Sequence, residues 1–141
     1  MRFEYRARLK RDASGRYTVS FPDLPGALTD GATRRDALAE AQDCLEEAIA
    51  GRIVRGETIP RPRAARGALV RVRPHLAAKA ALYLGVREKG LGPSALARLL
   101  KCHEKEARRL LDPSVPSKLN RLERALAALG KTLIVEVTEA A

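Results

Sequence analysis

Apolar and polar residues alternate over residues 2–9, a pattern typical of a β-strand with one buried face. Turn-forming residues follow at 10–15 and the alternation resumes over 17–21, so we expect the first two strands to form a hairpin. The next stretch, Phe-Pro-Asp-Leu-Pro-Gly at 21–26, has two prolines and a glycine, which end the strand and favour a stiff loop. A short third strand is expected at 27–29.

The next element predicted by the pattern is a helix with one apolar and one acidic face. Thr33 is placed to cap its N-terminus, since Asp36 follows three residues later. Apolar residues recur at helical spacing from Ala37 to Ile49. Residues 57–67 then have the composition of a loop, and one more strand is expected at 68–72. The acidic residues of the helix are Glu40, Asp43, Glu46 and Glu47.

From Pro74 onward the pattern is helical until residues 131–138, which are β-branched and alternate, so a final strand is expected there. Glycine and proline residues divide the helical part into separate helices. These helices are expected at 75–89, 93–100, 104–111 and 117–129.

The whole pattern predicts an α+β fold made of two modules. Residues 1–73 would form a small β-sheet-plus-helix module, and residues 74–141 an all-α module with a C-terminal strand. We expect the modules to be joined across roughly Arg55–Gly67, because this segment contains proline and has loop composition. Trypsin would then cut this segment after its exposed arginines and release a fragment close to residues 67–141. Those arginines are Arg61, Arg63 and Arg66.

Charge is unevenly distributed along the 141 residues, whose net charge is +10. Residues 1–60 sum to zero, whereas residues 61–74 and 75–141 each carry +5. A basic second half favours nucleic acid as its partner, and a neutral first half favours a different partner.

Composition disfavours several other classes of protein. No apolar run approaches the ~20 residues that span a bilayer, and the N-terminus has no apolar region of a secretory signal, so we expect a cytoplasmic protein with no membrane contact. Cys44 and Cys102 are distant from each other, which argues against a disulfide framework or a zinc site, and no metal or cofactor is expected. His75 and His103 are isolated and no carboxylate triad is evident, so no catalytic residue is expected.

The strongest local signal for function spans residues 96–110. Ala97 is a small residue where two packed helices would touch, and Cys102 can fill a tight turn between them. This is the spacing of a helix-turn-helix, whose second helix lies in the major groove of DNA. An ordinary helical hairpin with a charged, solvated face is the alternative interpretation. The candidate DNA-binding residues are Ser94, His103, Glu104, Lys105, Arg108 and Arg109.

The Phe-Pro-Asp-Leu-Pro-Gly run at 21–26, the spaced aromatic residues before it and the capped helix after it together resemble the HicB antitoxin family. The resemblance continues through Lys-Ala-Ala-Leu-Tyr at 79–83 and Ala-Leu-Gly-Lys at 128–131, as in the variant of the family with a helix-turn-helix tail. Ala32 departs from the pattern, because a polar residue more usually precedes the capping Thr33.

This resemblance implies a truncated ribonuclease-H-like fold without nuclease chemistry for the front module. That module would bind HicA, a small basic toxin that cleaves messenger RNA, and would cover the toxin's catalytic histidine. The tail would bind operator DNA and repress the operon of the pair. Reading a palindromic operator needs at least a homodimer.

An acidic or neutral surface suits a basic toxin, and a stiff loop can present contacts without a cost of ordering. Each of these features also has a purely structural explanation, as a solvated helix face or a chain corner. Two other functions stay open, a helix-turn-helix regulator without a toxin and a nuclease of ribonuclease-H-like fold. The candidate toxin-binding residues are Pro22, Asp23, Leu24, Pro25, Glu40, Asp43 and Glu47.

Overall fold

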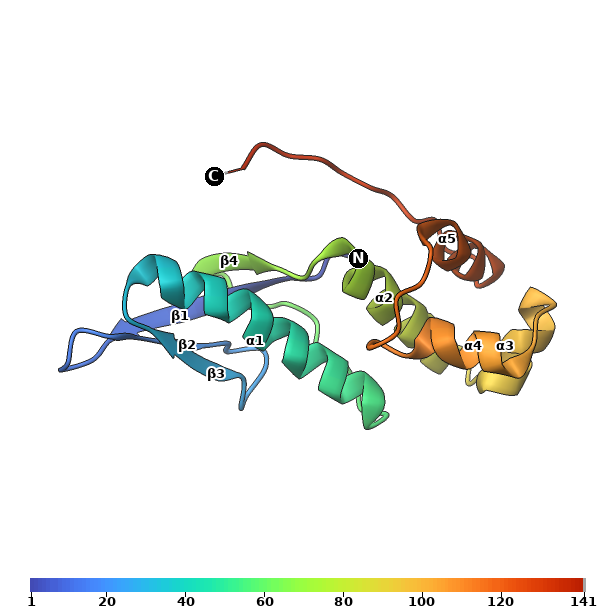
Figure 1. Cartoon of the computed structure of the whole chain (residues 1–141), viewed down its shortest axis with the longest axis horizontal. Coiled ribbons are helices and arrows are strands. Elements are labelled where there is room, and N and C mark those ends of the chain that lie inside the picture. Colours follow the sequence, from blue (N-terminus) through green and yellow to red (C-terminus); the bar gives the residue numbers. More distant parts are fainter. Residues whose placement is uncertain (141) are drawn as a thin grey trace.

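The computed structural model describes residues 1–140, and within them the predicted α+β class is confirmed. In Figure 1 the sheet and α1 lie at one end of an elongated molecule and α3, α4 and α5 at the other, with α2 between them. The strands are β1 (Glu4–Arg11), β2 (Tyr17–Ser20), β3 (Leu28–Gly31) and β4 (Ala68–Arg71). The helices are α1 (Arg34–Val54), α2 (Pro74–Glu88), α3 (Pro93–Leu100), α4 (Glu104–Leu111) and α5 (Leu119–Ala128).

The strands form one antiparallel sheet in the order β3-β2-β1-β4, so the predicted hairpin of β1 and β2 is confirmed. The apolar face of β1 packs in the same hydrophobic cluster as one side of α1. The Thr33 side chain accepts a hydrogen bond from the Asp36 N–H at 3.1 Å, which confirms the predicted helix cap. The buried residues of α1 recur every four positions and are Ala37, Ala41, Leu45, Ile49 and Ile53.

Gly31 lets the end of β3 lie directly against the first turn of α1. A Cβ atom at this position would come within 2.4 Å of the Ala37 backbone nitrogen, closer than side chains tolerate. The strand and the helix can pack this closely because glycine has no side chain.

Residues 55–67 connect α1 to β4, and β4 pairs with β1 at the opposite edge of the sheet from β3. The prediction of a linker between modules at Arg55–Gly67 is therefore wrong, because the segment is a loop inside the front part of the chain. The Tyr5 hydroxyl donates to the Pro60 carbonyl at 2.8 Å, and Ile59 is buried in the core. Composition alone does not distinguish a linker from a long connection that is fixed by such contacts.

Helix α2 contributes to two hydrophobic clusters. Ala80 and Tyr83 belong to the cluster of the sheet and α1, whereas Leu82 and Val86 belong to that of α3, α4 and α5. The boundary predicted between residues 73 and 74 falls at the first residue of this shared helix.

The helices of the second half begin and end within two residues of the predicted positions. Gly130 has a φ of +78°, as expected of a glycine that ends a helix. No helix among the described residues is long and apolar enough to cross a membrane.

The prediction of a C-terminal strand over Lys131–Thr138 is wrong for the single chain, since residues 131–140 form no strand. In Figure 1 this segment leaves α5 and runs back past β4. A strand needs a hydrogen-bonded neighbour, and no other strand of the described chain pairs with this segment. Ile134 and Val137 are consequently 80% and 92% exposed.

Candidate functional site

Helices α3 and α4 are joined by the three residues Lys101–His103, as the sequence predicts. Lys101 ends α3 in the left-handed conformation, with a φ of 55°. The Cys102 N–H donates to the Ala97 carbonyl at 3.0 Å, which closes the turn over the last carbonyls of α3. Glycine suits such a turn best, and Lys101 is the only non-glycine residue with positive φ in residues 1–140.

The two helices pack against each other through apolar residues of both. Leu96 and Ala97 on α3 and Ala107 and Leu110 on α4 are buried in one cluster. Cys102 is partly buried against the same cluster, so the turn is fixed to the core of the helical half. This packing gives the outer face of α4 a fixed direction.

All of the candidate DNA-binding residues are exposed, namely Ser94, His103, Glu104, Lys105, Arg108 and Arg109. Glu104 and Arg108 form an ion pair one turn apart on α4. The Arg108 guanidinium, together with the Ser94 hydroxyl, holds the pKa of Glu104 below its ordinary value. His103 begins α4 without a hydrogen bond from its side chain to the helix.

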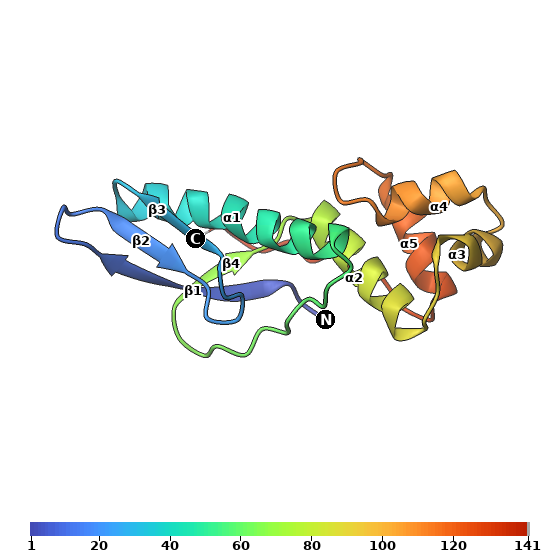
Figure 2. The same cartoon turned by 90° about the horizontal axis from the view of Figure 1, so that it is seen from below.

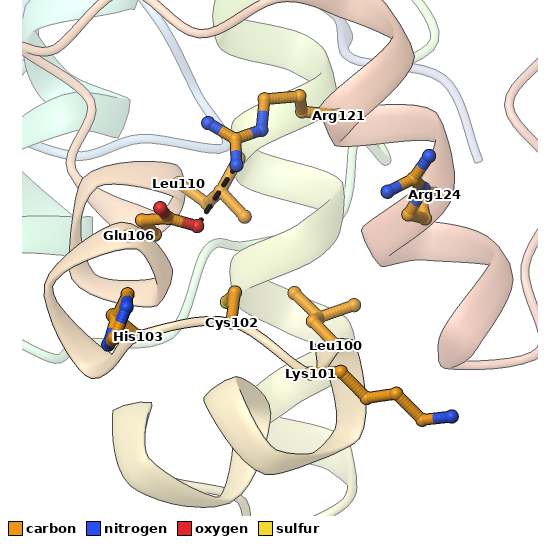
Figure 3. Close-up of a pocket in the computed structure, with 8 residues that line it drawn as sticks. All are labelled: Leu100, Lys101, Cys102, His103, Glu106, Leu110, Arg121 and Arg124. Atoms are coloured by element: carbon orange, nitrogen blue, oxygen red, sulfur yellow. Dashed lines mark hydrogen bonds and ion pairs between the residues drawn. The ribbon is translucent and has the colours of Figure 1, made fainter.

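Lys105 and Arg109 on α4 line a hollow shared with α5. A second hollow of about 430 Å³ adjoins it beneath the α3–α4 turn. Figure 3 shows Arg121 and Arg124 on one side of this second hollow and His103 and Glu106 on the other. The cations that α5 contributes were not predicted, although Lys118, Arg121 and Arg124 recur at a spacing of three, which places them along one side of a helix.

Lys79 is a second feature that the sequence reasoning did not single out by its chemistry. Its side chain is 0% exposed, and its ammonium donates to the carbonyls of Arg109 (2.8 Å) and Asp112 (2.7 Å) at the end of α4. Burial lowers the pKa of Lys79, and the charge of Asp112 partly opposes this. A cation at this end of a helix interacts favourably with the helix dipole. Lys79 therefore anchors α4 to α2.

In the front part of the chain, the loop at residues 21–26 is anchored more firmly than a free contact loop. The Asp23 carboxylate accepts hydrogen bonds from the N–H groups of Arg63 and Ala64, both at 3.0 Å. Leu24 is 1% exposed, so it is a core residue with no surface for a partner. Pro25 is exposed. Figure 2 shows this loop, between β2 and β3, beside the segment that leads from α1 to β4.

The acidic face of α1 has an internal partner as well as free carboxylates. The Arg73 guanidinium donates to Asp43 at 3.1 Å and to Glu46 at 2.7 Å, and its backbone N–H donates to Glu46 at 2.8 Å. These bonds raise the pKa of Arg73 and hold the start of α2 against α1. Glu40 and Glu47 are exposed and have no ion-pair partner within residues 1–140.

The two sets of candidate toxin-binding residues are not bonded to each other. Within the described chain, no hydrogen bond or ion pair joins Glu40, Asp43 or Glu47 to the loop at 21–26. Among residues 1–140, no group of three or more His, Cys, Asp or Glu side chains is placed to hold a metal ion.

Comparison with known proteins agrees with the resemblance seen in the sequence. The sequence model of one protein family, the HicB-like antitoxins of bacterial toxin–antitoxin systems, matches residues 4–81. These residues include the sheet, α1 and the first half of α2. The protein named antitoxin HicB 2 of Photorhabdus laumondii is 37% identical over 92% of this chain and 92% of its own length. The proteins named antitoxin HicB of Pseudomonas fluorescens and of Escherichia coli K12 are each 30% identical, over 98% and 92% of this chain and 96% and 95% of their own lengths.

These relatives span both the sheet-containing part and the helical part of the chain, and their names as antitoxins favour a regulatory role over an enzymatic one. The protein is therefore a member of the HicB-like antitoxin family of bacterial toxin–antitoxin systems.

Proposed function

We propose that the front part of the chain binds and neutralises a HicA-like toxin that cleaves messenger RNA. Membership of the HicB-like antitoxin family is the observation that carries this proposal. The exposed carboxylates Glu40 and Glu47 suit a basic RNA-binding partner. Pro22 and Pro25 lie at the fixed corner after β2, which can present contacts without a cost of ordering. The internal bonds of Asp23 and the burial of Leu24 hold the corner in place, and the bond of Asp43 to Arg73 does the same for the acidic face of α1.

The test is to mix the purified chain with the product of the short open reading frame next to its gene. A stable complex by light scattering and protection of an RNA substrate are expected. Replacement of Glu40 and Glu47 by Gln weakens the complex with a basic toxin, whereas Glu123→Gln, at an exposed carboxylate of α5 in the other half of the chain, serves as the control. A product that neither binds nor cleaves RNA would instead favour a regulator without a toxin.

The second part of the proposal is that α3 and α4 act as a helix-turn-helix that binds operator DNA and represses the operon. The support is a rigid pair of helices, fixed by a tight turn and by Lys79, that presents Lys105 and Arg109 outward. Arg108 is the third cation of this face, and its carboxylate partner Glu104 leaves it less free to contact DNA.

Operator affinity measured at several salt concentrations tests this part. Loss of a residue that contacts a base edge costs ~1–3 kcal/mol and relaxes the preference at one position. We expect a larger loss for Lys105→Ala and Arg109→Ala than for Arg108→Ala, because the Glu104 carboxylate already neutralises Arg108. Unchanged affinity in all three variants would show that α4 is not the reading helix.

A further inference from the structure

Two hollows lie between α4 and α5, and nearly all of the charged residues that line them are cations. They adjoin each other and share Glu106 and Leu110 on α4 and Arg121 and Arg124 on α5. Glu106 is the one carboxylate among the lining residues. The lining cations are Lys101, Lys105, Arg109, Lys118, Arg121 and Arg124.

One of these cations is used inside the protein. The Arg121 guanidinium donates to the Glu106 carboxylate at 3.0 Å, and this bond, drawn in Figure 3, links α5 to α4. The neighbouring cations Lys105, Arg109, Lys118 and Arg124 are exposed and form no ion pair within residues 1–140. The two adjoining hollows, from here on called the hollow between α4 and α5, therefore carry an excess of unneutralised positive charge.

We propose that this hollow holds the sugar-phosphate backbone of double-stranded DNA, with Lys118 and Arg124 on the phosphates beside the bases that α4 reads. The inference rests on the proposed DNA-binding function, because the hollow is continuous with the reading face through Lys105 and Arg109. A row of cations with one internally paired carboxylate matches a chain of phosphates, each of which carries one negative charge. Contacts to phosphate fix the position of the protein on the duplex and carry no sequence information.

The experiment compares the wild-type chain with a Lys118→Gln, Arg124→Gln double variant. The probes are a duplex that spans the DNA upstream of the gene, an unrelated duplex of equal length and a single-stranded RNA of equal length. Arg35→Gln is the matched control, since Arg35 is an exposed cation at the start of α1. Affinity is measured by fluorescence anisotropy over a series of salt concentrations.

The double variant is expected to lower the salt slope by about two, one unit for each lost phosphate contact. Its affinity should fall about tenfold or more for both duplexes, with the ratio between them unchanged, while Arg35→Gln behaves as wild type. An unchanged slope, in a protein whose operator binding is still lost in Lys105→Ala, would overturn this inference and leave the proposed function standing. A loss confined to the RNA probe would overturn it in favour of an RNA contact. Absence of duplex binding by the wild-type chain would overturn both.

Discussion

Lys79 connects the helix that both halves share to the helix proposed to read DNA. Lys79→Met leaves the carbonyls of Arg109 and Asp112 without their donor. A hydrogen bond to a charged group contributes about 1.5–3 kcal/mol, and removal of a buried cation offsets part of this, so we expect a net destabilisation of about 1–3 kcal/mol. Urea unfolding followed by circular dichroism measures the change. Lys89→Met, at an exposed position just after α2, is the control, and equal stability of both variants would contradict the anchoring role.

Tyr5 makes stability depend on alkaline pH. Burial, with a contribution from the Asp23 charge and against that of Arg52, raises the pKa of Tyr5 from 10.0 to about 12. Between these values the folded chain keeps a proton that the unfolded chain releases, so the free energy of unfolding falls as pH rises. The stability that Tyr5 contributes by staying protonated is complete below pH 10, and the rise of its pKa from 10.0 to about 12 corresponds to about 2–3 kcal/mol.

Tyr5→Phe should therefore lose less stability than the wild-type chain between pH 10 and about 12. At neutral pH the variant should be less stable by about 1 kcal/mol, because the bond to the Pro60 carbonyl is lost. Urea unfolding of both proteins at neutral pH, at pH 10 and at about pH 12 gives the comparison. Identical pH dependence of the two proteins would show that Tyr5 does not titrate in this way.

Individual residues show which buried positions and roles could be predicted from the sequence and which could not. The alternating face of β1 and the spacing of α1 predicted the buried positions, since burial follows the period of the element. Leu24 was predicted as a contact residue and is a core residue, because an irregular loop has no period that indicates which side faces inward. Lys79 was not predicted as an anchor, because its partners are backbone carbonyls 30 and 33 residues away.

At the level of elements, the loop between α1 and β4 is expected to keep its place after it is cut. Trypsin can reach Arg61, Arg63 and Arg66, which are exposed. The nicked chain should nevertheless elute as one particle, because β4 stays paired with β1. Gel filtration before and after denaturation distinguishes the outcomes. Release of a free fragment close to residues 67–141 under native conditions would contradict the pairing.

The elements also differ in how far the sequence alone could place them. The helices of the second half were predicted closely, because glycine and proline mark their ends. The role of residues 55–67 was not predicted correctly, because the contacts that fix the segment come from Tyr5 and Asp23, far away in the sequence. The hollow between α4 and α5 likewise depends on packing between helices that no local pattern specifies.

For the whole molecule, we propose that residues 132–137 pair with the same segment of a second copy. Val135 is 62% exposed, its neighbours are mostly apolar, and an extended segment with free backbone groups favours pairing with another strand. Val135→Pro removes a backbone donor from the pairing and should give monomers, whereas Val135→Thr should not. Light scattering at micromolar concentration is the measurement, and a dimeric proline variant would place the dimer contact elsewhere.

We propose that one end of the molecule neutralises a toxin and the other end binds DNA. The most direct test co-expresses the neighbouring toxin with either the wild-type chain or the Lys105→Ala, Arg109→Ala double variant, each from a promoter without the operator. We expect both proteins to restore growth equally, although only the wild-type chain binds the operator duplex. Failure of the wild-type chain to restore growth would contradict the antitoxin function, and failure of the folded double variant alone would contradict the separation of the two surfaces.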